Sequence, residues 1–193
     1  KQGDHYRSSE KYSSVVEALE KIIQALPSEQ ERKEFKQIMV LSKAWQKMTL
    51  AEAEASPPLY AEASKLFEEA KEVSPNEIMK MLLLGHSRFC KALEVGMNFA
   101  DTRETALHAA ATQHLESAAN YYVRADFYSA SEYAKATGLL FDAYLQMDNA
   151  KKEIDPEKKA KLYMMTERVL QASAGSYMKA EHPEKREQVL TLL

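Results

Sequence analysis

The 193-residue sequence has few of the residues that form turns, disulfides or membrane spans. Its 5 glycines and 6 prolines are too few for a chain with many tight turns, and they favour long helices joined by short links. The one cysteine excludes an internal disulfide and is compatible with a reducing compartment. The longest apolar run, residues 78–85, is interrupted by Lys80 and falls far short of the roughly 20 residues that cross a bilayer.

The sequence also lacks a strong charge bias and the common catalytic motifs. A formal net charge of −3 gives no basic footprint for nucleic acid. There is no glycine-rich phosphate loop, no Gly-x-Ser-x-Gly elbow, and no glutamate followed three residues later by histidine, as di-iron bundles need. We therefore expect no enzyme activity, no cofactor, no metal and no membrane span.

Two further expectations concern the context of the chain. No charged and then apolar signal segment opens it, so the default location is the cytoplasm. The first residue is Lys1 rather than methionine, which leads us to expect a fragment of a longer protein.

Alanine, glutamate, lysine, leucine and methionine are abundant, and all are strong helix formers. Residues able to cap a helix precede proline at Ser56–Pro57, Ser74–Pro75, Asp155–Pro156 and, with a poorer cap, His182–Pro183. Capping-box spacing occurs at Ser28–Glu31, Ser74–Glu77 and Ser129–Glu132, and Asp101 or Thr102 can cap a further helix. These signals predict an all-α chain of about seven to eight helices, over residues 5–26, 28–55, 57–73, 75–100, 102–125, 129–153, 155–180 and from 183 onward.

A pattern of small and large residues repeats along the chain. In residues 60–75, YAEASKLFEEAKEVSP, the positions Ala63, Phe67 and Ala70 share one helical face and Pro75 follows. The same sizes recur 48 residues later at Ala111, Leu115 and Ala118. Partial matches follow at 160, 164 and 167 and precede at 15, 19 and 22, which predicts a near-constant period of 48–49 residues. Alanines at the ends of such a stripe allow a neighbouring helix to approach closely.

The stretch from Ala63 to Pro75 resembles the second helix of a tetratricopeptide repeat. The resemblance implies a right-handed stack of antiparallel helix pairs, an α-solenoid with helices longer than is usual in the family. It implies a single helical-repeat domain over residues 1–193, with a half unit at 5–26, units at 28–73, 75–125 and 129–180, and the start of another at 183–193. It also implies a scaffold or interaction module that binds a protein or peptide in a groove lined by the first helix of each pair.

Polar side chains run along the helices that would line this groove. They are Lys43 and Lys47 on the first, Arg88, Lys91 and Asn98 on the second, and Lys135, Asp142 and Gln146 on the third. A mildly basic groove of this kind would hold an acidic peptide or a terminal carboxylate. The alternative interpretation is an ordinary solvated face of each helix.

Two other functions remain open. A self-association module would use the exposed ends of the stack, where repeats need polar caps to stay soluble. A helical enzyme would use His86 and Cys90, which lie four residues apart on one helical face. The simpler interpretation of this pair is a buried histidine beside a buried thiol.

Overall fold

The structure is a computed structural model that describes residues 2–193, with side chains from residue 3 onward. This part of the chain forms eight α-helices and no strand, which confirms the all-α prediction. The helices are α1 (Gln2–Ala25), α2 (Glu29–Glu54), α3 (Pro57–Val73), α4 (Glu77–Thr102), α5 (Thr105–Arg124), α6 (Tyr128–Lys152), α7 (Pro156–Lys179) and α8 (Pro183–Leu190).

Local capping chemistry sets several of these boundaries as predicted. The Ser28 side chain accepts a hydrogen bond from the Glu31 amide at the start of α2. Asp155 accepts from the amides of Glu157 and Lys158 at the start of α7, with Pro156 in the first helical turn. Each bond satisfies an amide that has no partner within its own helix.

Three predicted caps were wrong. The N-terminus of α4 is capped by Asn76, whose Oδ1 accepts from the amides of Ile78 and Met79, and not by Ser74. Ser129 lies inside α6, and its hydroxyl donates to the Ala180 carbonyl at the end of α7. The helix expected to begin after residue 101 begins at Thr105, because α4 continues to Thr102.

Four helices end without a glycine. Ala55, Arg103, Asp126 and Glu181 adopt left-handed backbone conformations, with φ of 50°, 60°, 56° and 63°, in the turns after α2, α4, α5 and α7. Glycine usually occupies such positions because it has no side chain to clash. Short turns are thus made in a chain that has few glycines.

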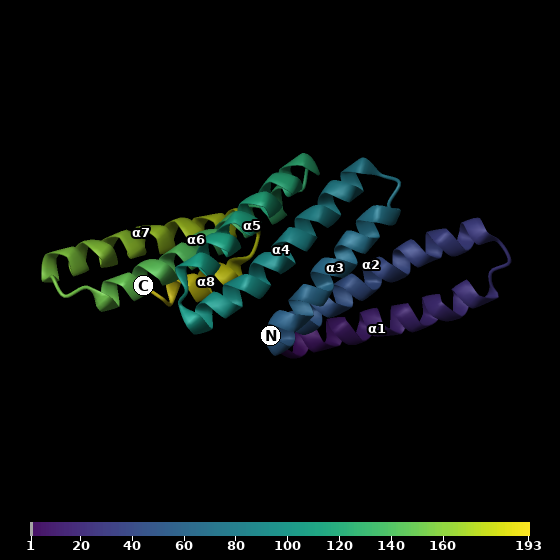
Figure 1. Cartoon of the computed structure of the whole chain (residues 1–193), viewed down its shortest axis with the longest axis horizontal. Helices are drawn as coiled ribbons and strands as arrows, with labels where there is room; N and C mark the ends of the chain where they lie inside the picture. The colour runs from purple at the N-terminus through teal and green to yellow at the C-terminus, as the bar shows by residue number, and fades with distance from the viewer. Residues whose placement is uncertain (1) are drawn as a thin grey trace. The chain divides into compact units, whose positions relative to one another are not determined.

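The chain divides within α4 into two compact units, Lys1–Glu94 and Val95–Leu193. In the first unit α2 packs against α1 and α3, and in the second unit α6 packs against α5 and α7, and α7 against α8 (Figure 1). Sequential packing of neighbours agrees with the predicted fold class. The single-domain boundaries and repeat units remain predictions.

The two central copies of the predicted stripe, in α3 and in α5, are buried. Ala63, Phe67 and Ala70 of α3 are at most 4% exposed. Ala111, Leu115 and Ala118 of α5 are likewise buried. The residues that give the repeat its small–large–small pattern therefore lie in the interior of both units.

Of the two outer matches of the constant period, the one in α7 was wrong, and the one in α1 holds only at its central residue, Leu19, which is 7% exposed. Met164 is 57% exposed, and Val15 and Ile22 are also exposed. The buried stripe of α7 lies six residues further along, at Thr166, Leu170 and Ser173. The helix α7 begins ten residues before its stripe, whereas α5 begins six before its own, so about one additional helical turn accounts for four of the six residues. The greater length of α5, 20 residues against 17 in α3, contributes the rest.

The second unit consequently contains an internal repeat with an offset of 55 residues. All six of the following pairs are buried: Ala111 and Thr166, Leu115 and Leu170, Ala118 and Ser173, Ala119 and Ala174, Tyr122 and Tyr177, and Ala134 and Val189. The turns after Tyr122 and Tyr177 are alike too, because the amides of Phe127 and His182 bond to the carbonyls of these tyrosines. The hairpins α5–α6 and α7–α8 therefore use the same packing scheme.

Small residues place helices in close contact within this unit. The Ser173 hydroxyl donates to the Ala136 carbonyl at 2.8 Å, which joins α7 directly to the backbone of α6. A side chain at Gly96 would overlap the ring of Phe141, so this glycine leaves room for that ring against α4. Such contacts are what small residues on a helical stripe allow.

The offset of 55 makes a prediction about stability. Leu170→Ala should lower the free energy of unfolding by about 2–5 kcal/mol, because it leaves a cavity in the core. Met164→Ala, at the position expected from a constant period, should change it by at most about 0.5 kcal/mol. Chemical denaturation of both variants measures the difference, and equal losses would contradict the revised repeat.

Candidate functional site

The pair His86 and Cys90 lies in the core of the first unit. The His86 ring contacts those of Trp45 and Phe67, with centroids 4.7 and 5.1 Å away. Its exposed fraction is 7%, and Cys90 is completely buried. The pair therefore has no surface through which a substrate could reach it.

Burial also sets the charge state of both groups. It lowers the pKa of His86 from 6.5 to about 4, so the imidazole is neutral at pH 7. It raises the pKa of the Cys90 thiol, with a smaller contribution from the charge of Glu52. Because a thiolate is the nucleophilic form of cysteine, these values indicate an inert thiol beside a structural histidine.

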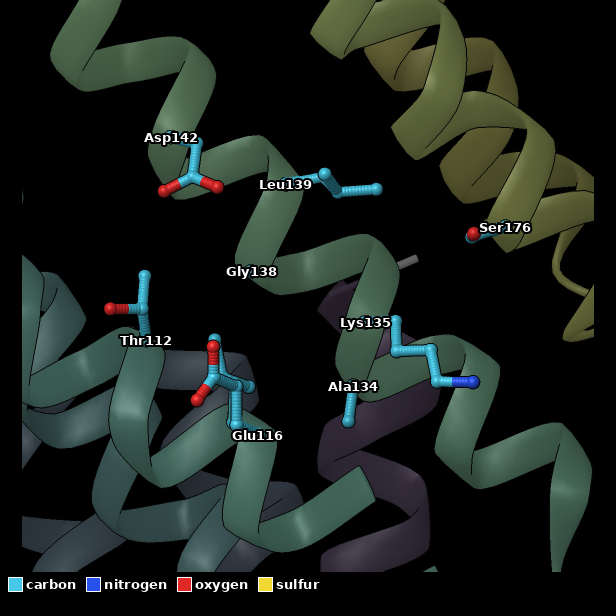
Figure 2. A pocket seen from close by; sticks show the side chains of 9 residues that line it. Thr112, Glu116, Ala134, Lys135, Gly138, Leu139, Asp142 and Ser176 are labelled. Carbon is cyan, nitrogen blue, oxygen red and sulfur yellow. The ribbon is translucent and has the colours of Figure 1, made fainter. Parts of the chain in front are cut away.

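The second unit contains an open pocket of about 330 Å³ on the hairpin of α5 and α6. Leu115, Ala134, Gly138 and Leu139 form its apolar lining. The polar lining consists of Thr112 and Glu116 from α5, Lys135 and Asp142 from α6, and Ser176 from α7. Figure 2 shows the α6 residues following one another along the helix, with Thr112 and Glu116 on the neighbouring α5.

The charges of this pocket are unevenly matched. Lys135 bonds to Glu132 at 2.8 Å, and this hydrogen bond is the main reason that the pKa of the Glu132 carboxyl lies below its usual range. Asp142 Oδ1 lies 2.9 Å from His108 Nε2. Glu116 has no ion pair within the described part of the chain. The cation of the pocket is thus already neutralised, whereas its carboxylates are not matched by lysine or arginine.

The structure brings some of the predicted partner-binding residues together and separates others. Lys135 and Asp142 line the pocket, and Gln146 lies one turn beyond Asp142 on α6. Asn98 is exposed near the end of α4, in the second unit. The remaining four, Lys43, Lys47, Arg88 and Lys91, belong to the first unit.

The predicted basic character is largely cancelled by neighbouring carboxylates. Lys43 bonds to Glu20 at 3.0 Å and Lys47 to Glu62 at 2.7 Å. Lys91 bonds to Glu94 at 2.7 Å, and Lys135 is paired as described above. Sequence spacing alone missed the two partners that come from neighbouring helices.

Two buried oxygens of α6 lack a hydrogen-bond partner among the described residues. They are Gln146 Oε1 and Ser131 Oγ. An unpaired buried polar atom costs about 1–3 kcal/mol. Both lie on the helix that supplies most of the pocket, and Gln146 was among the predicted binding residues.

Several residues of the pocket were not predicted as binding residues. Thr112, Glu116 and Ser176 come from helices outside the predicted groove, and Leu115 was assigned only a packing role. The one available signal was Gly138, since glycine inside a helix costs about 1 kcal/mol relative to alanine. A side chain there would meet Leu115 only at an ordinary 3.7 Å, so the glycine is not required for close helix packing.

The described residues form neither a metal-binding cluster nor a membrane-spanning helix. No group of three or more histidine, cysteine, aspartate or glutamate side chains in residues 2–193 is arranged to hold a metal ion. No helix in this range combines the length and apolar character needed to cross a membrane.

No protein-family model matches the chain. Neither a curated protein nor a solved structure shows significant similarity to it.

The buried histidine makes a prediction about pH. Because the folded pKa of His86 is about 4 and the ordinary value 6.5, the unfolded chain binds more protons between these values. The contribution of His86 to the free energy of unfolding is complete above about pH 6.5 and is lost as the pH falls toward 4, by about 3 kcal/mol in total. His86→Leu should remove this component, as measured by denaturation from pH 7.5 to 4.5. Parallel pH profiles for the two proteins would contradict the assignment.

Proposed function

We propose that the chain is a protein–protein interaction module, resembling tetratricopeptide repeats, that holds a segment of a partner protein against α6. The observation that carries the proposal is the open pocket between α5, α6 and α7. Its lining combines apolar side chains with a few polar groups, which is typical of recognition sites. The volume of about 330 Å³ suits one anchoring side chain of a larger partner.

The chemistry of the other candidate site supports binding over catalysis. The thiol of Cys90 is buried and protonated, and His86 is enclosed by aromatic rings. Neither group reaches the pocket, whose lining comes from α5, α6 and α7. A surface that binds through shape and charge needs no activated nucleophile.

Self-association is a second candidate, favoured by exposed apolar residues near the start of α7. Ile154 is 92% exposed, and Met164 and Met165 are 57% and 51% exposed. Exposed apolar side chains, where they gather into a patch, can mark an interface between protein chains. A second copy of the chain would cover these side chains.

One experiment separates these functions. A photo-crosslinking amino acid is placed at Leu139 in the pocket, and separately at the exposed Glu167 of α7 as a control. In lysate of the source cells, the interaction module predicts adducts with a discrete partner at Leu139 that are absent at Glu167. Adducts with a second copy, formed mainly at Glu167, would support self-association instead. Equal, diffuse labelling at both positions would contradict both functions.

A further inference from the structure

We infer that the pocket of α5, α6 and α7 binds a basic side chain, lysine or arginine, of the partner segment. The inference rests on the proposed function and specifies the chemistry of the partner. It reverses the expectation of an acidic peptide, which came from lysines that the structure shows paired with carboxylates.

The hairpins α3–α4 and α5–α6 differ in how their interiors are filled. Residues of α3 correspond to residues of α5 at an offset of 48, and residues of α4 to residues of α6 at an offset of 51, because α5 is three residues longer than α3. In α3–α4 the corresponding positions are filled: Phe67, Leu83 and Ser87 are all buried there. Ser64, Ser87 and Glu68 are linked by hydrogen bonds of 3.0 and 3.1 Å.

In α5–α6 each of the three filling residues is replaced by a smaller one. Leu115 takes the place of Phe67, Ala134 that of Leu83, and Gly138 that of Ser87. All three smaller residues line the pocket. The cavity therefore lies where the first hairpin has side chains. The remaining contacts of the hairpin do not require this space to stay empty.

The polar groups around this apolar lining carry more negative than unpaired positive charge. Glu116 and Asp142 are at the pocket and come from different helices (Figure 2). Asp142 Oδ1 bonds to His108, and Oδ2 has no hydrogen-bond partner in the described residues. The one cation of the lining, Lys135, is bound to Glu132. A second positive charge would be attracted here, and a negative one repelled.

The lining suits the shape and charge of a basic side chain. Lysine and arginine have an apolar stem and a charged end, and they bury the stem while the charge stays near water. Leu115, Gly138 and Leu139 offer the apolar contact, and the carboxylates of Glu116 and Asp142 offer acceptors for the cation. A glutamate side chain would meet like charges, and a purely apolar one would leave the carboxylates unused.

The test uses NMR spectra of the intact 15N-labelled chain with four five-residue alanine peptides as probes. The central residue of each peptide is lysine, arginine, norleucine or glutamate. We expect the lysine or arginine peptide to shift the amide signals of Gly138 and Leu139 with a dissociation constant on the order of 1 mM. The norleucine peptide should bind at least about tenfold more weakly, because it lacks the charged hydrogen bonds.

Matched variants assign the effect to the pocket. Gly138→Leu places a side chain in the cavity and should abolish the shifts, whereas Gly175→Leu, at an open position on α7, should leave them unchanged. Glu116→Gln combined with Asp142→Asn keeps the shape and removes the charge. This double variant should weaken the lysine or arginine peptide about tenfold and leave the norleucine peptide unaffected.

Any of three results would overturn the inference. Equal binding of the lysine and norleucine peptides, or stronger binding of the glutamate peptide, would show that the carboxylates do not select the partner. An absence of shifts at Gly138 and Leu139 with all four peptides would show that the pocket binds no basic side chain. The crosslinking at Leu139 would still decide the proposed function in each case, so the two failures can be told apart.

Discussion

Within each unit the structure depends on one constraint: neighbouring helices must pack closely along a buried stripe of small and large side chains. The stripe is Ala63, Phe67 and Ala70 on α3, Ala111, Leu115 and Ala118 on α5, and Thr166, Leu170 and Ser173 on α7. The small residues admit the neighbouring backbone, as the bond from Ser173 to the Ala136 carbonyl shows. The large residue fills the space beside the contact, where it contributes the hydrophobic stabilisation of the core.

Variation on this constraint accounts for the difference between the two candidate sites. Where the space is filled by Phe67, His86 and Cys90, the result is a sealed core with a neutral imidazole and a protonated thiol. Where the smaller Leu115, Ala134 and Gly138 stand at the positions of Phe67, Leu83 and Ser87, the same kind of hairpin carries an open pocket. A recognition site can thus arise in a helical hairpin by loss of side-chain volume, without catalytic groups.

Much of the fold could be predicted from the sequence because its signals are local. Caps such as Ser28 and Asp155 act within their own first turn, and the face shared by Ala63, Phe67 and Ala70 follows from helical periodicity. The register of α7 could not be predicted, because about one extra turn moves the stripe without changing its pattern. The pocket was missed for a related reason. It is formed by residues from three helices, and the pairing of Lys43 with Glu20 or of Lys47 with Glu62 likewise depends on which helices become neighbours.

The most direct test of this account is to transfer the filling residues of the first hairpin into the second. The triple variant Leu115→Phe, Ala134→Leu and Gly138→Ser should fold with a free energy of unfolding within about 1 kcal/mol of the parent, because the pocket has room for these side chains. Its thermal and chemical denaturation should stay cooperative, and its pocket should be closed to peptide probes. A loss of more than about 3 kcal/mol, as strong overpacking produces, would show that the two hairpins do not share a packing scheme.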